Sequence, residues 1–190
     1  MADPLSLTRP LTAADAVLLA IDVQQDSRHA ADGAEAVRAA TERLIRAAVL
    51  LGVPVVAAEL SSAAEGSADR SLERPLREAG ARRFERTALG CLGDRPIKTA
   101  LAETGRGQVI VVGVETHVAV QQTVLSLLRH GYRPAVCADA VASRRGLDHD
   151  VSLRRMRQAG AIVTTTESAI FELPGDAADE RSGEVLALVR

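Results

Sequence analysis

Aromatic residues are almost absent from this chain: it has two Phe, one Tyr and no Trp among 190 residues. Proteins that bind single-stranded nucleic acid stack bases on several exposed rings, and this sequence has too few rings for such a platform. The net charge of -2 also argues against a basic surface. We therefore expect no nucleic acid partner, and a core built from Ala, Val, Leu and Ile.

Lysine and cysteine are scarce as well. Lys98 is the only lysine, because the other basic residues are all arginine, and Cys91 and Cys137 are the only cysteines. Two cysteines are too few for a disulfide framework or a structural zinc site. The first residues lack the apolar core of a signal peptide, and no apolar run approaches the ~20 residues that cross a bilayer. We expect a cytoplasmic protein without a membrane partner.

Short apolar runs, typical of buried strands, alternate with helical patterns along the chain. Predicted strands cover residues 16–22, 53–60, 82–85, 108–115, 134–140 and 161–164. Predicted helices cover residues 33–51, 72–79, 95–104, 116–130, 148–158, 166–173 and 180–189. Such alternation favours right-handed crossovers and a parallel sheet covered on both faces. No repeat or linker divides the chain, so we expect a single domain over residues 1–190.

The carboxyl ends of the predicted strands are the expected place for a ligand, because open parallel sheets bind ligands there, where the strand order reverses. Asp22 ends the first strand, Arg86 follows the third, and residues 113–120 join the fourth strand to its helix. A carboxylate walled by apolar residues tends to have a raised pKa and can act as a general acid or base. The alternative role for Asp22 is to cap the following turn.

Residues 113–120 place backbone N–H groups at the start of a helix, a typical anion or oxyanion site. The alternative is an ordinary turn that Thr116 caps. His117, in the first helical turn, is more typical of a structural histidine than of a catalyst. Asp139 ends the fifth strand, and Ser143, Arg144 and Arg145 follow it; these residues form either a pocket rim or a solvated loop.

No motif predicts a bound cofactor or metal. The chain has no G-x-G-x-x-G after its first strand and no P-loop. The histidines lie on separate elements without ligand spacing; they are His29, His117, His130 and His149. We expect neither a cofactor nor a metal.

Three segments resemble the isochorismatase-like hydrolase superfamily: LLAIDVQ (18–24), GVETHVAVQQTVLSLLRHGY (113–132) and ADAVASR (138–144). The later run RMRQAGAIVTTTESAIFELPGDA (155–177) resembles its isochorismatase-domain-containing branch most. The resemblance covers nearly the whole chain. It implies a three-layer α/β/α, Rossmann-like fold with a six-stranded parallel sheet, a small-molecule substrate and a homo-oligomer.

Members of this superfamily that cleave amides use an Asp, a Lys and a Cys. The resemblance places the Asp at Asp22, the Lys at Arg86 and the Cys at Ala119. It also implies a cis peptide between Val114 and Glu115. The implied substrate-binding residues are Gln24, Val114, Glu115, His117 and Val118. Nicotinamidase relatives hold a metal with an Asp and a His after the second strand, but residues 61–71 contain no His.

The two substitutions have different consequences. Ala119 has no nucleophile, so a thioester at this position is excluded. Arg86 keeps a positive charge but releases no proton near neutral pH, so it is suited to hold Asp22 or an anionic substrate. Cys91, five residues after Arg86, is a candidate for a displaced nucleophile, although the resemblance suggests an apolar pocket residue there.

Three interpretations follow. The chain is a hydrolase without a cysteine nucleophile, in which Asp22 is the general acid/base; true isochorismatases, which this chain resembles in lacking the Cys, protonate a vinyl ether in this way. Alternatively, it is an inactive pseudoenzyme that binds a ligand or a partner. Thirdly, it is a Cys-to-Ala variant of an amide hydrolase, although Arg86 counts against this because one engineered change does not explain two departures.

Overall fold

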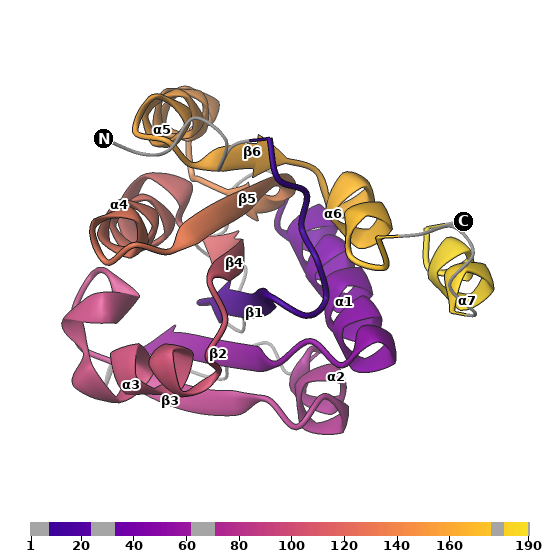
Figure 1. Ribbon diagram of the computed structural model, residues 1–190. Coiled ribbons are helices and arrows are strands. Elements are labelled where there is room, and N and C mark those ends of the chain that lie inside the picture. Colours follow the sequence, from indigo (N-terminus) through magenta and orange to yellow (C-terminus); the bar gives the residue numbers. More distant parts are fainter. Residues whose placement is uncertain (1–7, 24–32, 62–70, 176–180, 190) are drawn as a thin grey trace.

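The computed structural model describes residues 8–23, 33–61, 71–175 and 181–189. Its centre is a six-stranded parallel sheet in the order β3-β2-β1-β4-β5-β6 (Figure 1). The strands are β1 (Ala16–Ile21), β2 (Val55–Leu60), β3 (Arg82–Arg86), β4 (Gln108–Val114), β5 (Arg133–Ala142) and β6 (Ile162–Thr164). This sheet confirms the α/β fold expected from the sequence.

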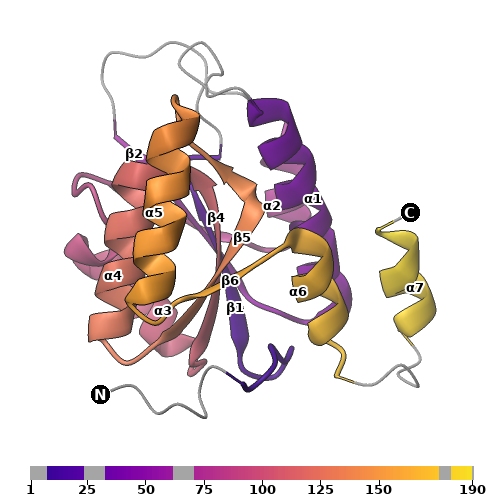
Figure 2. The ribbon, with the colours of Figure 1, turned by 90° about the horizontal axis from the view of Figure 1, so that it is seen from above.

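Helices cover both faces of the sheet, which gives three layers (Figure 2). One face packs against α1 (Ala34–Leu51), α2 (Glu73–Glu78) and α6 (Thr166–Glu172), with α7 (Ser182–Ala187) outside them. The other face packs against α3 (Arg95–Glu103), α4 (Gln121–Arg129) and α5 (Gly146–Gln158). Alternate residues of β1 point to opposite faces, so Leu18 joins the first apolar cluster and Leu19 the second.

The predicted helix over residues 116–130 is divided in the structure. Its first turn is a π-helix, η4 (Thr116–Val120), and only the rest is α-helical. Thr116 does not cap it, contrary to the prediction: no side-chain cap bond forms there, and its Oγ1 lies 3.1 Å from Nδ1 of His149 on α5. A π-turn in a helix is often found at a functional site. A short 3-10 helix, η3 (Cys91–Gly93), precedes α3 and was also not predicted.

The strand order reverses at β1, whose neighbours β2 and β4 lead to opposite halves of the sheet. Gly113 permits the close approach of β4 to β1 at the carboxyl end of this crevice. A Cβ at Gly113 would lie 1.9 Å from the carbonyl oxygen of Ile21, and the φ angle of +133° also disfavours any side chain. The approach brings the residue after β1, Asp22, beside the segment that leaves β4.

Candidate active site

Asp22 directly follows β1 and is almost completely buried, with 3% of its surface exposed. Its φ angle of +54° lies in the left-handed region, which Asp and Asn tolerate better than most residues. The Asp22 N–H donates to the carbonyl oxygen of Ala58 (2.9 Å), and carboxylate Oδ1 accepts the Leu60 N–H (2.8 Å). Contacts to β2 therefore fix both the backbone and the side chain of Asp22.

Arg86, the last residue of β3, forms a buried ion pair with Asp22. Its Nη2 donates to Oδ2 of Asp22, while Nη1 donates to the carbonyl oxygens of Ala88 (2.6 Å) and Leu89 (3.0 Å). The Nε atom is buried and has no hydrogen-bond partner among the residues that the structure describes. The guanidinium thus holds the carboxylate on one side and the turn after β3 on the other.

The pKa of Asp22 is raised above its usual value of 3.8. Burial is the largest cause, since it disfavours the charged carboxylate; the charge of Arg86 and the hydrogen bonds from Arg86 and Leu60 oppose it. A raised pKa keeps part of the Asp22 population protonated at a higher pH than an exposed aspartate would be. This agrees with the sequence-based expectation for a carboxylate among apolar residues.

Asp94 stabilises the turn that Arg86 contacts, and sequence reasoning missed it. Its carboxylate accepts the N–H groups of Thr87 and Ala88 (3.1 Å each) and the Thr87 hydroxyl (3.0 Å). Burial alone would raise the pKa of Asp94, but these hydrogen bonds outweigh it and lower the pKa. The signal in the sequence was an aspartate just before Arg95-Pro96, where a helix starts.

Ala119 lies within η4, is 3% exposed, and belongs to the same apolar cluster as Ile21 and Cys91. Cys91 is completely buried, and burial raises the pKa of its thiol to about 11, so it stays protonated near neutral pH. Both its burial and its raised pKa argue against Cys91 as a displaced nucleophile.

The segment after β4 contains a cis peptide between Val114 and Glu115, as the resemblance implied. Two of its N–H groups are already used, since those of Val118 (3.1 Å) and Val120 (3.2 Å) donate to the carbonyl oxygen of Glu115. The expected anion site has correspondingly fewer free donors. Val114 packs against Val37 and Ala142, while the candidate binding residue Gln24 lies outside the described residues.

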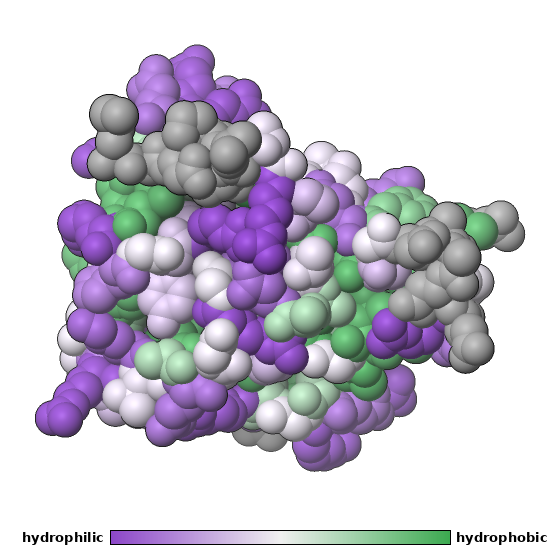
Figure 3. Space-filling model, viewed as in Figure 1, coloured by the Kyte–Doolittle hydropathy of each residue, from purple (hydrophilic) through white to green (hydrophobic). Residues whose placement is uncertain are grey.

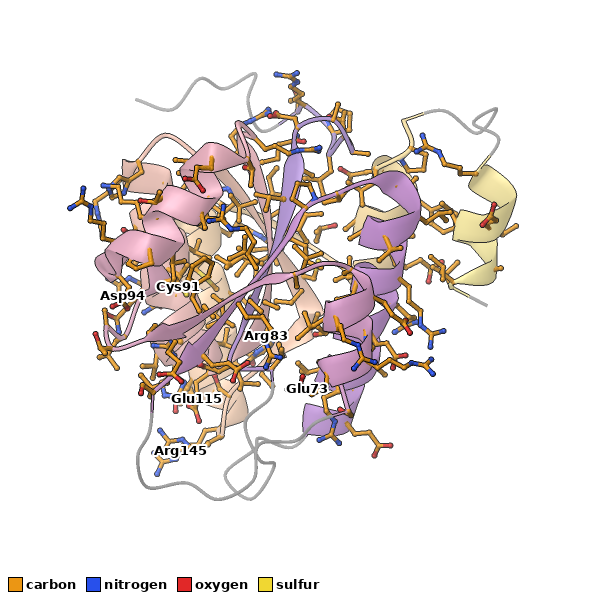
Figure 4. All side chains as sticks on the ribbon, turned by 90° about the horizontal axis from the view of Figure 1, so that it is seen from below. Glu73, Arg83, Cys91, Asp94, Glu115 and Arg145 are labelled. Carbon is orange, nitrogen blue, oxygen red and sulfur yellow. The ribbon has the colours of Figure 1, made fainter. Side chains whose placement is uncertain are left out.

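Glu115 and His117 extend from this segment toward the end of β5. Nδ1 of His117 lies 3.0 Å from the Ser143 hydroxyl and 3.3 Å from Oε2 of Glu115, and Nε of Arg144 lies 2.8 Å from Oε1 of Glu115. Figure 4 shows Glu115 at the edge of the sheet where the strands end, with Arg145 farther out. Ser143 and Arg144 also line a cleft of about 280 Å³, so they form a pocket rim.

Asp139 has a structural role. β5 continues past it to Ala142, with an irregularity in its pairing to β4, instead of ending near Asp139. Its Oδ1 accepts the N–H (2.8 Å) and the hydroxyl (3.0 Å) of Thr166, which fixes the start of α6. Asp139 also lines the cleft, but its Oδ1 is bound to the start of this helix.

A cluster of metal ligands and a membrane-spanning helix are both absent from the described ranges. Nowhere in these ranges do three or more His, Cys, Asp or Glu side chains gather as metal ligands would. Within the same ranges, no helix combines the length and the apolar character needed to cross a membrane.

A family model for the isochorismatase domain matches residues 16–168. The chain belongs to the isochorismatase family. A secreted isochorismatase effector of Phytophthora sojae is 34% identical over 178 residues, 92% of this chain and 84% of that protein. Isochorismatase domain-containing protein 1 of Danio rerio is 31% identical over 182 residues, 95% of this chain but only 62% of that longer protein.

The fold is shared with solved structures. The MAR1 ribonuclease from Caenorhabditis elegans superimposes with a TM-score of 0.87 at 29% identity, covering 95% of this chain and 92% of the other. These comparisons confirm the family and the α/β fold predicted from the sequence.

Proposed function

We propose that this isochorismatase-family protein hydrolyses a small molecule without a cysteine nucleophile, with Asp22 as the general acid and base. The buried ion pair of Asp22 and Arg86 is the observation that supports this most. Two ionisable side chains are kept almost completely out of water at the crevice of the sheet, although the residue at the position where the resemblance places the family's cysteine is Ala119. Buried charges are costly to a fold and are concentrated at functional sites.

Hydrolysis of a vinyl ether fits these groups. Protonated Asp22 delivers its proton to the terminal vinyl carbon, and water adds to the resulting oxocarbenium carbon. The proton released by the water returns to Asp22, and the hemiketal collapses to an alcohol and a carbonyl compound. Arg86 supplies no proton, because a guanidinium stays charged at neutral pH; it fixes the carboxylate and its charge.

A second candidate function is a binding protein of the same family that has lost catalysis. The observation in its favour is that both carboxylate oxygens of Asp22 already have partners, Leu60 and Arg86. Such an Asp22 is less free to exchange a proton with a ligand. This candidate predicts ligand binding, or none, without turnover of any ester, amide or vinyl ether.

We propose that the partner of this protein is a small molecule, that the protein binds neither nucleic acid nor a membrane, and that it uses no cofactor. We propose a single domain over residues 1–190 and a cytoplasmic location. The names of two similar proteins do not match this location and partner: one protein is called secreted and the other a ribonuclease. A short RNA therefore belongs among the compounds to be tested.

We propose that the chain forms a homo-oligomer through apolar surface on the α1, α6 and α7 side. Exposed large apolar side chains occur there on three helices: Val49 (51%), Phe171 (45%) and Leu186 (37%). Figure 3 shows apolar surface over α1 near α6. Light scattering after size-exclusion chromatography is expected to give a multiple of 20.0 kDa, and Phe171→Glu is expected to shift it toward one copy. A monomeric unmodified chain would contradict this.

Activity is tested on a panel of isochorismate, nicotinamide, simple amides and esters, and a short RNA. The unmodified chain is expected to turn over the vinyl ether and to leave the amides intact, because Ala119 has no nucleophile. Ala119→Cys with Arg86→Lys restores the amide-cleaving set of side chains and is expected to add amide hydrolysis. Substrate loss and product formation are followed by liquid chromatography with mass detection.

The remaining outcomes distinguish the alternatives. No turnover of the vinyl ether by the unmodified chain would reject the proposed function, and no turnover of any compound would favour the binding protein. Amide hydrolysis by Ala119→Cys alone, with Arg86 in place, would identify the chain as an amide hydrolase that lacks only its cysteine. RNA cleavage by the unmodified chain would overturn the proposed small-molecule partner.

A further inference from the structure

A serine and a histidine lie within hydrogen-bond reach of each other at the carboxyl edge of the sheet, outside the Asp22–Arg86 pair. The Ser143 hydroxyl, just beyond β5, lies 3.0 Å from Nδ1 of His117 in η4. A hydroxyl becomes a nucleophile when an adjacent base can take its proton, and this separation is within the 2.6–3.2 Å range that such pairs show. The chain thus holds a hydroxyl and a candidate base side by side.

Glu115 completes the group. Its Oε2 lies 3.3 Å from the same Nδ1, is buried, and has no hydrogen-bond partner in the described structure. Its Oε1 is held by Arg144 at 2.8 Å. When Nδ1 takes a proton, the imidazolium charge lies beside this carboxylate, and Oε2 gains a partner. The unpaired oxygen is therefore suited to the state in which His117 has accepted a proton.

Space for a ligand adjoins the hydroxyl. Ser143 is 7% exposed and lines the cleft of about 280 Å³ between the start of α1, the end of β5 and the start of α5. Val37 and Ala142 supply apolar wall, and His149 lies at its side with Nδ1 turned to Thr116. A cleft of this size accepts a small acyl group rather than a long chain.

We propose that Ser143, His117 and Glu115 form a second reactive site that hydrolyses small carboxylic esters through an acyl-serine. Ser143 Oγ attacks the ester carbonyl while its proton passes to Nδ1 of His117, and Glu115 stabilises the imidazolium. The tetrahedral intermediate expels the alkoxide, which takes the proton from His117 and leaves as the alcohol. Water then attacks the acyl-serine, gives its proton to His117, and releases the carboxylic acid as Ser143 regains its hydrogen.

A fluorophosphonate, which phosphonylates activated serines and releases fluoride, tests this site on the full chain. Intact mass is expected to show one adduct per chain, and peptide mapping is expected to place it on Ser143. Labelling is expected to vanish in Ser143→Ala and to slow by roughly 100-fold or more in His117→Gln, because the base is lost. Ser168→Ala, at an exposed serine of α6, is the control and is expected to label like the unmodified chain.

Absence of an adduct on the unmodified chain, an adduct on another residue, or an undiminished rate in His117→Gln would each overturn the proposal. Ser143→Cys provides a second measurement, in case an alanine at this position impairs folding. Iodoacetamide is expected to alkylate the new thiol at least ~10-fold faster with His117 present than in the double variant with His117→Gln. Cys91 and Cys137 are fully buried, so they add little background alkylation. Equal alkylation rates with and without His117 would also overturn the proposal. No step involves Asp22, so these results and those on vinyl ether hydrolysis are independent.

Discussion

Asp22→Asn is expected to lower hydrolysis of the vinyl ether by about 10²–10⁴-fold, the usual contribution of a positioned general acid. The asparagine side chain has the same shape as aspartate, but its amide group cannot deliver a proton to the substrate and take it back. The substitution suits the site structurally, because Asn tolerates the φ angle of +54° at this position. One of the two acceptor oxygens is lost, so either the Leu60 N–H or Arg86 loses its present partner.

The measurement is kcat/KM for the unmodified chain and the variant, with urea unfolding to show that both are folded. Asp150→Asn is the matched control: it makes the same chemical change at an exposed residue of α5 and is expected to keep full activity. Turnover that survives in Asp22→Asn would remove Asp22 from the mechanism.

The pH dependence follows from the raised pKa of Asp22. A general acid acts in its protonated form, so the rate is expected to fall as the pH rises through the pKa of Asp22, which lies above 3.8. The stability of the fold is expected to change with pH in the same direction. Asp22 binds its proton more tightly in the folded than in the unfolded chain, so its protonation stabilises the fold at low pH. This contribution to the free energy of unfolding declines as the pH rises from about 3.8 to the raised pKa. Asp22→Asn is expected to lose both trends.

The sheet, the order of its elements and the grouping of Asp22 with Arg86 could be predicted from the sequence. Buried strands of a parallel sheet are continuous apolar runs, and AVLLAI and QVIVVGV have that character. Because β1 and β3 run parallel in the same sheet, the residues at their carboxyl ends lie at the same edge of the sheet. The raised pKa was also expected, because burial disfavours the charged carboxylate, and at Asp22 this effect outweighs the opposing effects of Arg86 and Leu60.

Three details of the site depend on contacts between distant residues and were not predictable. Thr116 matches the pattern of a helix cap, but its hydroxyl contacts His149, 33 residues away. The position of Asp94 before Arg95-Pro96 matches a helix start, but its carboxylate instead stabilises the turn at Thr87 and Ala88 through three hydrogen bonds, which that local pattern does not reveal. The pairing of His117 with Ser143 requires the actual register of β4 and β5, whose irregularity the sequence does not reveal.

Arg86→Met is expected to destabilise the fold by about 3–5 kcal/mol at pH 7, because it leaves the Asp22 carboxylate buried without its counter-charge. Methionine keeps much of the volume of this fully buried side chain, so the effect reports on charge and hydrogen bonds more than on a cavity. The carbonyl oxygens of Ala88 and Leu89 lose their donor as well. The free energy of unfolding is measured with urea.

The contributions of charge and of packing to the stability loss in Arg86→Met are distinguished by changing the pH and by adding a second substitution. Without Arg86, nothing from the guanidinium opposes the effect of burial, so the pKa of Asp22 rises further above 3.8. The variant is therefore expected to recover part of its stability as the pH is lowered toward 4, where Asp22 holds its proton. In the Asp22→Asn background Arg86→Met is expected to cost at least ~1 kcal/mol less, since no carboxylate remains unpaired. An equal cost in both backgrounds, unchanged between pH 7 and pH 4, would mean that Arg86 supports the turn after β3 and contributes little to holding the charge of Asp22.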